Sequence, residues 1–179
     1  VYKRQRLTYD YKSRYMAEVN FGYNGSERLA AGHRFEFFPA VSAGWVASSE
    51  KFWEPISKYI NHFKIRGSYG LVGSDAFASG APHFLYQNNI GIGSAPNFRT
   101  GLPTSEISKK GPGFYVLAVQ DAGWEHVKKF DIGFDMMLFN QLNITFDYFH
   151  DKRERILMSR ASWPSMLGYW GSKPWSNIG

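Results

Sequence analysis

Residues 130–158, FDIGFDMMLFNQLNITFDYFHDKRERILM, contain two segments in which apolar and polar side chains alternate. The apolar positions are Phe130, Ile132, Phe134, Met136 and Leu138 in the first segment and Leu142, Ile144, Phe146 and Tyr148 in the second. Alternation with a period of two predicts β-strands rather than helices. Each strand therefore has one apolar face. Its large side chains require an extensive apolar surface opposite them, which is either a protein core or a lipid bilayer.

The same stretch predicts its own turn. The apolar residues of both segments have even numbers, so they lie on one side of a sheet only if each even-numbered residue pairs with another even-numbered residue. This requirement places Leu138 opposite Leu142. The connection is then the three-residue loop 139–141. The alternation near the N-terminus obeys the same rule and predicts a second three-residue loop at 12–14.

The remaining sequence extends this pattern to six strands. We predict them at residues 6–11, 14–26, 37–48, 63–73, 124–138 and 142–158. Residues 51–61 follow an N-cap serine and place apolar side chains at helical spacing, so they are predicted to form a short amphipathic helix. Residues 74–122 and 159–179 are rich in Gly, Pro and Ser and are predicted to be loops, with short strands near 84–88 and 114–119.

The predicted connections differ in length at the two ends of an antiparallel sheet. One end has the two three-residue turns and the helix-bearing connection. The other end has a connection of medium length and the long segments 74–122 and 159–179. This asymmetry is typical of an outer-membrane barrel with short periplasmic turns and long extracellular loops. The predicted fold is therefore all-β, an antiparallel transmembrane β-barrel segment of about six strands with one short periplasmic helix.

Composition excludes several classes of protein. The 179 residues include no cysteine, which excludes a disulfide framework and a thiolate metal site. The formal net charge is +6, but the cations are scattered and no element collects them into a nucleic-acid groove. Aromatic residues make up 18% of the chain, which suits the aromatic girdles of a membrane barrel.

Catalytic and cofactor motifs are absent from the sequence. It contains no nucleophile-elbow, zinc-protease or phosphate-loop motif, and its five histidines show no metal-ligand spacing. We therefore expect no enzymatic activity, no cofactor and no metal site.

Several ordered segments resemble one family. They are YDYK (9–12), NGS (24–26), FFPAVSAGW (37–45), KIRGSYG (64–70), KFDIGFD (129–135) and DYF (147–149). Together they closely resemble the C-terminal barrel half of the SusC/RagA-like TonB-linked outer-membrane receptors of Bacteroidetes. The resemblance covers residues 6–179, which we assign to a partial receptor barrel domain. Residues 1–5 look like a translated sequencing adaptor and receive no structural role.

The resemblance implies a location, a set of partners and a cargo. It implies a 22-stranded barrel in the cell outer membrane, closed by an N-terminal plug that lies outside these residues. It also implies a SusD-like surface lipoprotein as a lid. Energised import of oligosaccharides or peptides through TonB would follow, with TonB contacting the absent N-terminal region.

The strand pattern assigns candidate residues to three surfaces. The lipid-facing candidates are Val19, Phe21, Phe130, Ile132, Phe134, Ile144, Phe146 and Tyr148. The lumen-lining candidates are Glu18, Asn20, Arg66, Asp131, Asp135 and Asp147. The loop candidates for contact with cargo or lid are Tyr86, Tyr115, Trp163, Trp170 and Trp175, because aromatic faces suit sugars and peptides. The predicted register places Asp135 opposite Thr145 and Asp147 opposite Gly133, so the two carboxylates are not directly paired.

Two other functions remain open. In a soluble β-rich carbohydrate-binding module, the apolar faces would be buried against a second layer, whereas in a barrel they would be exposed in isolated coordinates. A passive porin would lack a plug and a TonB-contacting segment in the full-length gene. The exposure of Phe130, Ile132, Phe134, Phe146 and Tyr148 distinguishes the module from the barrel.

Overall fold

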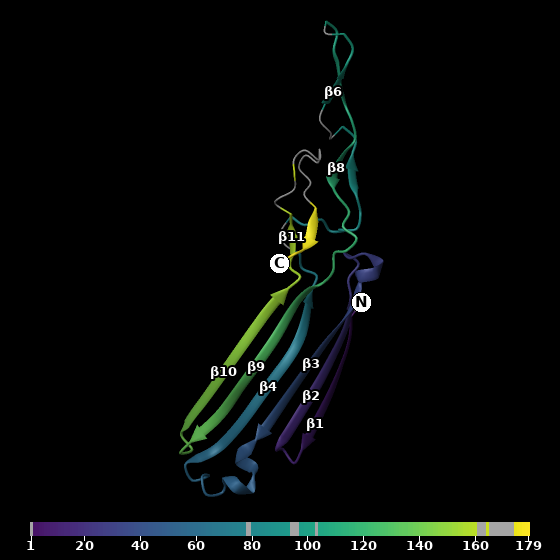
Figure 1. Ribbon diagram of the computed structural model, residues 1–179. Helices are drawn as coiled ribbons and strands as arrows, with labels where there is room; N and C mark the ends of the chain where they lie inside the picture. The colour runs from purple at the N-terminus through teal and green to yellow at the C-terminus, as the bar shows by residue number, and fades with distance from the viewer. Residues whose placement is uncertain (1, 78–79, 94–96, 103, 161–163, 165–173) are drawn as a thin grey trace. The chain divides into compact units, whose positions relative to one another are not determined.

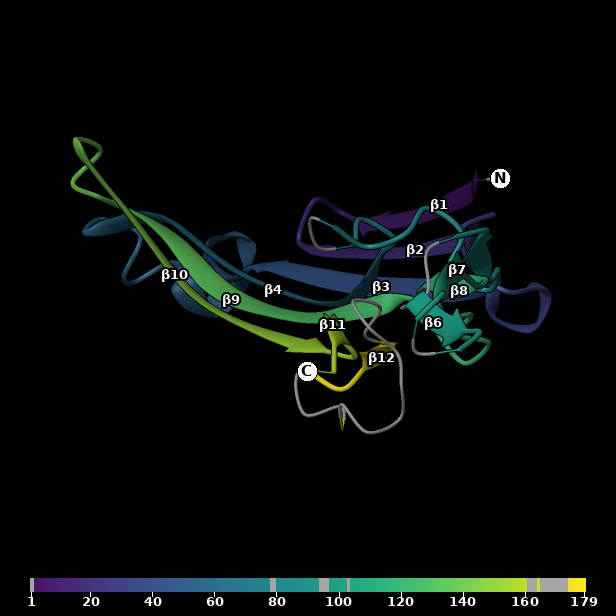
Figure 2. The same cartoon turned by 90° about the horizontal axis from the view of Figure 1, so that it is seen from above.

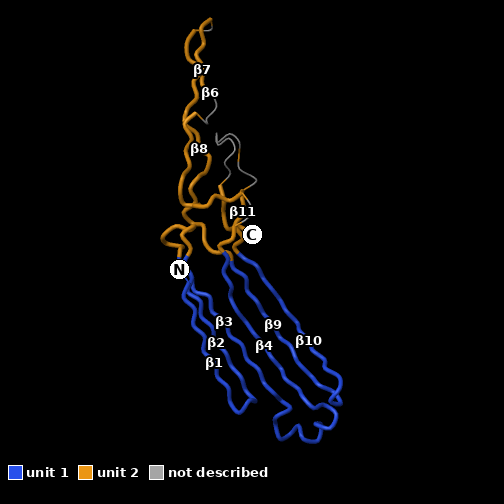
Figure 3. The backbone as a smooth tube through the Cα atoms, turned by 180° about the vertical axis from the view of Figure 1, so that it is seen from behind, with its two compact units in different colours: residues 1–25, 35–74, 126–154 blue, residues 26–34, 75–125, 155–179 orange. Residues whose placement is uncertain are grey.

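The computed structural model describes residues 2–77, 80–93, 97–102, 104–160, 164 and 174–179. The chain divides into two compact units, which Figure 3 distinguishes by colour. The sheet unit consists of residues 1–25, 35–74 and 126–154, and the loop unit consists of residues 26–34, 75–125 and 155–179.

The sheet unit is a single six-stranded sheet. Its strands are β1 (Tyr2–Tyr11), β2 (Tyr15–Gly25), β3 (Phe35–Val46), β4 (Ile60–Ser74), β9 (Glu125–Leu138) and β10 (Leu142–Glu154). Their order in the sheet, β1-β2-β3-β4-β9-β10, is also their order along the chain (Figure 1). The structure therefore confirms the predicted all-β antiparallel sheet of six strands.

Both predicted hairpin registers are confirmed. Leu138 pairs with Leu142 across the loop 139–141, and Tyr11 pairs with Tyr15 across the loop 12–14. In each loop two consecutive residues have positive φ, as a type I′ turn requires, and neither of them is glycine. The requirement that the apolar residues of both strands lie on one face therefore determined the turns more strongly than local turn propensity did.

The sheet is strongly curved, as the view from above in Figure 2 shows. Its first strand is longer than predicted, because residues 2–5 continue β1 and pair with residues 21–24 of β2. The predicted strand at 6–11 did not include these residues.

The predicted helix at 51–61 is wrong. This connection contains only two 3-10 turns, η2 (Ala47–Ser49) and η3 (Lys51–Trp53), followed by irregular turns. Pro55 has no N–H for an α-helical bond to the Lys51 carbonyl, and the Glu54 N–H bonds to that carbonyl instead at 3.3 Å. The Trp53 ring also stacks on Phe63 of β4 with a centroid distance of 5.2 Å. The packing of Trp53 against the sheet therefore outweighs the helical spacing of the apolar residues in 51–61.

The loop unit is built from small hairpins. Its strands are β5 (Asn89–Gly91), β6 (Asn97–Thr100), β7 (Ile107–Lys110), β8 (Gly113–Val116), β11 (Leu157–Ser159) and β12 (Trp175–Asn177), which pair as β5-β8, β6-β7 and β11-β12. A short 3-10 turn, η1 (Ala31–His33), lies in the first loop. The predicted strand near 114–119 overlaps β8, but residues 84–88 form turns and the next strand begins at Asn89. The tail is also not a simple loop, since β12 pairs with β11.

Side-chain and backbone hydrogen bonds join the segments of the loop unit. Arg28 donates to the backbone carbonyl of Asp75 at 2.7 Å, and the Trp124 indole donates to that of Arg34 at 3.1 Å. The largest fully buried side chains of the described chain also belong to this unit, and they are Leu29, Leu85 and Leu157. In the described part of the chain, no helix has the length and apolarity needed to cross a membrane.

Candidate functional site: the polar face of the sheet

The six-stranded sheet has one apolar and one polar face. Phe63, Phe134 and Phe146, from β4, β9 and β10, form a row of contacting rings on the apolar face, with centroid distances of 5.9 and 5.6 Å. Large side chains of this face are exposed, including Leu7, Tyr9, Val41, Tyr69, Phe130, Ile132, Phe146 and Tyr148. A soluble monomer rarely exposes so continuous an apolar surface.

The exposure of this face decides between the module and the barrel. Phe130, Ile132, Phe146 and Tyr148 are 40–55% exposed, and Phe134 is half-buried. None of the five is covered by a second layer of the described chain. The soluble carbohydrate-binding module required these side chains to be buried, so the structure contradicts it.

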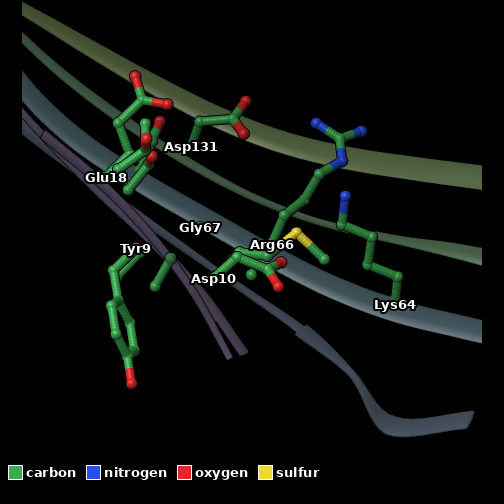
Figure 4. A pocket seen from close by; sticks show the side chains of 14 residues that line it. Tyr9, Asp10, Glu18, Lys64, Arg66, Gly67 and Asp131 are labelled. Carbon is green, nitrogen blue, oxygen red and sulfur yellow. The ribbon is translucent and has the colours of Figure 1, made fainter. Parts of the chain in front are cut away.

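The polar face contains a hollow of about 590 Å³ (Figure 4). Its floor includes three small residues, Ser42, Gly44 and Ser68. Its charged lining residues are the acidic Asp10, Glu18 and Asp131 and the basic Lys64 and Arg66. The Tyr9 ring, by contrast, points away from the charged side chains in Figure 4. The small floor residues leave space above the sheet, and charges of both signs make that space hydrophilic.

Arg66 joins two carboxylates on this face. Its Nε lies 3.3 Å from Asp135 Oδ2 and its terminal nitrogen lies 2.6 Å from Asp147 Oδ1. Thr145 donates to the other oxygen of Asp135 at 3.1 Å. Asp147 belongs to β10 and Arg66 to β4, so this ion pair crosses β9. It crosses at Gly133, where an added Cβ would lie 2.1 Å from Asp147 Oδ1.

A second polar cluster lies on β1 and β2. Glu18 forms an ion pair with Arg6 and accepts a hydrogen bond from the Asn20 amide at 2.7 Å. Asn20 also lines a second hollow of about 460 Å³ on the same sheet. Of the six predicted lumen residues, the first hollow brings together Glu18, Arg66 and Asp131, and Arg66 links Asp135 and Asp147 to it.

The predicted loop aromatics do not form one cluster among the described residues. Tyr86 packs against Phe84 with a centroid distance of 6.0 Å and is half-buried. Tyr115 lies in β8 and is exposed, and Trp175 lies in β12 and is half-buried. Trp163 and Trp170 lie outside the described residues.

The residues of the site that escaped the sequence interpretation include Asp10, Lys64 and Gly133. Lys64 lines the hollow, and its alternation with Arg66 on β4 is a signal that could have placed it there. Gly133 permits the ion pair across β9. Its position opposite Asp147 was predicted, but nothing in the sequence indicates that Asp147 reaches beyond it to a third strand.

The described residues include no group of three or more His, Cys, Asp or Glu side chains that could hold a metal ion. What the polar face offers is fixed charges of both signs on a curved wall. Such a surface can hold water and charged or polar solutes, while the opposite face suits an apolar solvent.

Comparison with known proteins indicates the class of protein to which this sheet belongs. No protein-family model matches the chain. Curated relatives include the TonB-dependent receptors P39 and P3 of Formosa agariphila. P39 is 29% identical over 143 residues, which cover 79% of this chain, and P3 is 26% identical over 156 residues, which cover 87%. The chain is a segment of a TonB-dependent outer-membrane receptor. It spans only 12–14% of the length of these two receptors.

The fold of this TonB-dependent receptor segment also matches solved structures. In the RagAB peptide importer in its closed-closed state, the match covers 99% of this chain and 18% of the solved chain, with a TM-score of 0.76 and 17% identity. A second structure, of the RagAB peptide transporter, gives a TM-score of 0.72 at 17% identity and covers 98% of this chain. The segment therefore shares its fold with part of the RagAB barrel. As a segment of a TonB-dependent receptor, it belongs to the outer membrane.

Proposed function

We propose that these residues form part of the barrel wall of a TonB-dependent importer that takes up peptides or oligosaccharides. The observation that carries this proposal is the two-faced sheet. Its apolar face is exposed in isolation, and its polar face is curved, charged and hollowed. In this proposal the apolar face contacts lipid and the polar face lines the lumen.

Peptides are the better-supported cargo. The lining of the first hollow contains three carboxylates and two cationic side chains, whereas sugar sites rely on aromatic platforms. The only aromatic lining residue, Tyr9, points away from those charges. Charged groups of both signs suit peptide side chains and termini. The structural likeness to a peptide importer supports the same choice.

A SusD-like surface lipoprotein is the proposed partner. The loop unit offers Tyr115 as an exposed aromatic side chain for such a contact. TonB would contact regions of the receptor other than these residues, because the long and short connections described here are parts of the barrel domain.

Uptake by cells tests the proposal. The full-length receptor would be deleted and restored in its own host, and uptake of a labelled peptide mixture and of labelled oligosaccharides would be followed with and without TonB. We expect peptide uptake to require both the receptor and TonB. Uptake that continues without TonB would instead indicate a passive porin, and TonB-dependent uptake of oligosaccharides alone would contradict the peptide assignment. Co-purification from detergent-solubilised outer membranes tests the lipoprotein partner.

A further inference from the structure

Two lysines interrupt the apolar face of β9 and β10. Successive pairs along this face are Tyr148 with Ile132, His150 with Phe130, and Lys152 with Lys128. Alternate residues of a strand share a face, so the apolar surface becomes cationic within two pairs. The change occurs at the end of the sheet that bears the long connections.

The arrangement of charges at this point is unusual for a strand pair. Lys128 and Lys152 lie directly opposite each other, and like charges in that position are destabilising. Glu154 lies between them, with its two carboxylate oxygens 2.6 Å from Lys128 Nζ and 2.8 Å from Lys152 Nζ. One carboxylate between two ammonium groups leaves a net positive charge. Each ammonium group has three N–H donors, and Glu154 needs only one from each.

The position of these cations matches a membrane interface. From Leu138 to Lys128, β9 extends about 34 Å at ~3.4 Å per residue, which for a strand tilted by about 40° corresponds to about 26 Å across the membrane. A barrel's apolar band is about 25 Å tall, so Lys128 lies just beyond its edge. The barrel predicted from the sequence has extracellular long connections, and this inference rests on that orientation and on the proposed function. The cations then lie at the headgroups of the outer leaflet, where Lys side chains attract anionic groups.

We infer that Lys128, His150 and Lys152 bind the phosphate of an outer-leaflet glycolipid. The remaining ammonium donors and an imidazole N–H hydrogen-bond to the phosphate oxygens. The acyl chains of the lipid lie along Ile132 and Tyr148, which are about half exposed on the same face. Glu154 keeps the two lysines together but competes with the phosphate for their donors.

Native mass spectrometry of the full-length receptor tests this site. The receptor would be purified from outer membranes in detergent and titrated with monophosphoryl lipid A or with dephosphorylated lipid A. We expect wild type to prefer the phosphorylated lipid by about 25-fold, since each of the two interfacial lysines contributes roughly a fivefold gain. The double variant K128Q/K152Q should lose this preference. Glu154→Gln should increase it, because the competing carboxylate is gone.

The matched control is K109Q/K110Q, which removes two exposed lysines from β7 of the loop unit. It should retain the wild-type preference. Three results would overturn the inference: no preference in wild type, an unchanged preference in K128Q/K152Q, or displacement of the phosphorylated glycolipid by an equal amount of phosphatidylglycerol. Failure of the proposed function is detected separately, because a spin label at Phe146→Cys would then show no contact with lipid. Failure of the orientation is detected with Ile92→Cys in the loop unit, which would then not react with a membrane-impermeant thiol reagent on intact cells.

Discussion

The sheet unit and the loop unit differ in how their large apolar side chains are arranged. In the loop unit Leu29, Leu85 and Leu157 are fully buried, as in an ordinary protein interior. Among the described residues of the sheet unit, the only large apolar side chains that are buried are Phe38 and Val46, and many others are about half exposed. The apolar side chains of the sheet form one continuous exposed face, which needs a solvent other than water. The loop unit instead has a small buried interior beside separate exposed side chains such as Ile92.

Truncating a leucine in each unit should give the largest contrast. Leu29→Ala removes a fully buried side chain, and we expect it to destabilise the loop unit by about 2–5 kcal/mol. Limited proteolysis of intact cells would show faster cleavage within residues 75–125. The control Leu7→Ala changes a side chain that is 64% exposed in the sheet unit, and it should leave this cleavage rate unchanged. Equal cleavage rates in the two variants would contradict the difference in burial.

Replacing an exposed isoleucine by a charged residue tests directly whether that position contacts lipid or water. Ile132→Lys lies on the apolar face of the sheet, and we expect it to cost about 2–4 kcal/mol of membrane stability. Ile92→Lys is the matched change in the loop unit, where Ile92 is 96% exposed, and it should have almost no effect. Unfolding of the full-length receptor in lipid vesicles by urea would measure both. Tolerance of Ile132→Lys would mean that this face meets water.

Two glycines on adjacent strands test how the polar face is held together. A Cβ at Gly133 would meet Asp147 Oδ1 and would lie 2.7 Å from the Phe146 carbonyl oxygen, so Gly133→Ala should displace the carboxylate from Arg66 and shift the β10 backbone, at a cost of about 1–3 kcal/mol. Gly67→Ala is the control, because its Cβ would make only an ordinary contact at 3.7 Å. Thermal unfolding of the receptor in detergent would rank the two variants. A similar midpoint for both would show that neither the ion pair across β9 nor the close approach of β10 to Gly133 contributes to stability.

The sequence predicts the sheet unit far better than the loop unit, for physical reasons. Period-two alternation and the parity of Leu138 and Leu142 were sufficient for the hairpin register, because a one-residue slip would reverse every apolar side chain. No such constraint acts on residues 75–125, where short hairpins depend on turns and tertiary packing. The false helix at 51–61 has the same origin, since Trp53 packs on the sheet instead of continuing a helical face.

The sequence predicted which face of the sheet carries the residues of the candidate site, but not which of these residues contact each other. Alternation placed Arg66, Asp135 and Asp147 on the polar side of their strands. Their meeting depends on the order of β4, β9 and β10 in the sheet and on the missing side chain of Gly133, neither of which alternation specifies. The hollow likewise depends on small residues, Ser42 and Gly44, being adjacent to charged residues of other strands.

The central claim is that the two faces of β10 meet different solvents. Because the 179 residues contain no cysteine, spin labels can be introduced singly as Phe146→Cys, Asp147→Cys and Tyr148→Cys within this segment of the full-length receptor. Electron paramagnetic resonance in lipid vesicles would compare collisions with oxygen, which concentrates in lipid, and with a water-soluble nickel complex. We expect oxygen to dominate at 146 and 148 and nickel to dominate at 147. Equal accessibility at all three positions, or nickel dominating at 146 and 148, would contradict the account.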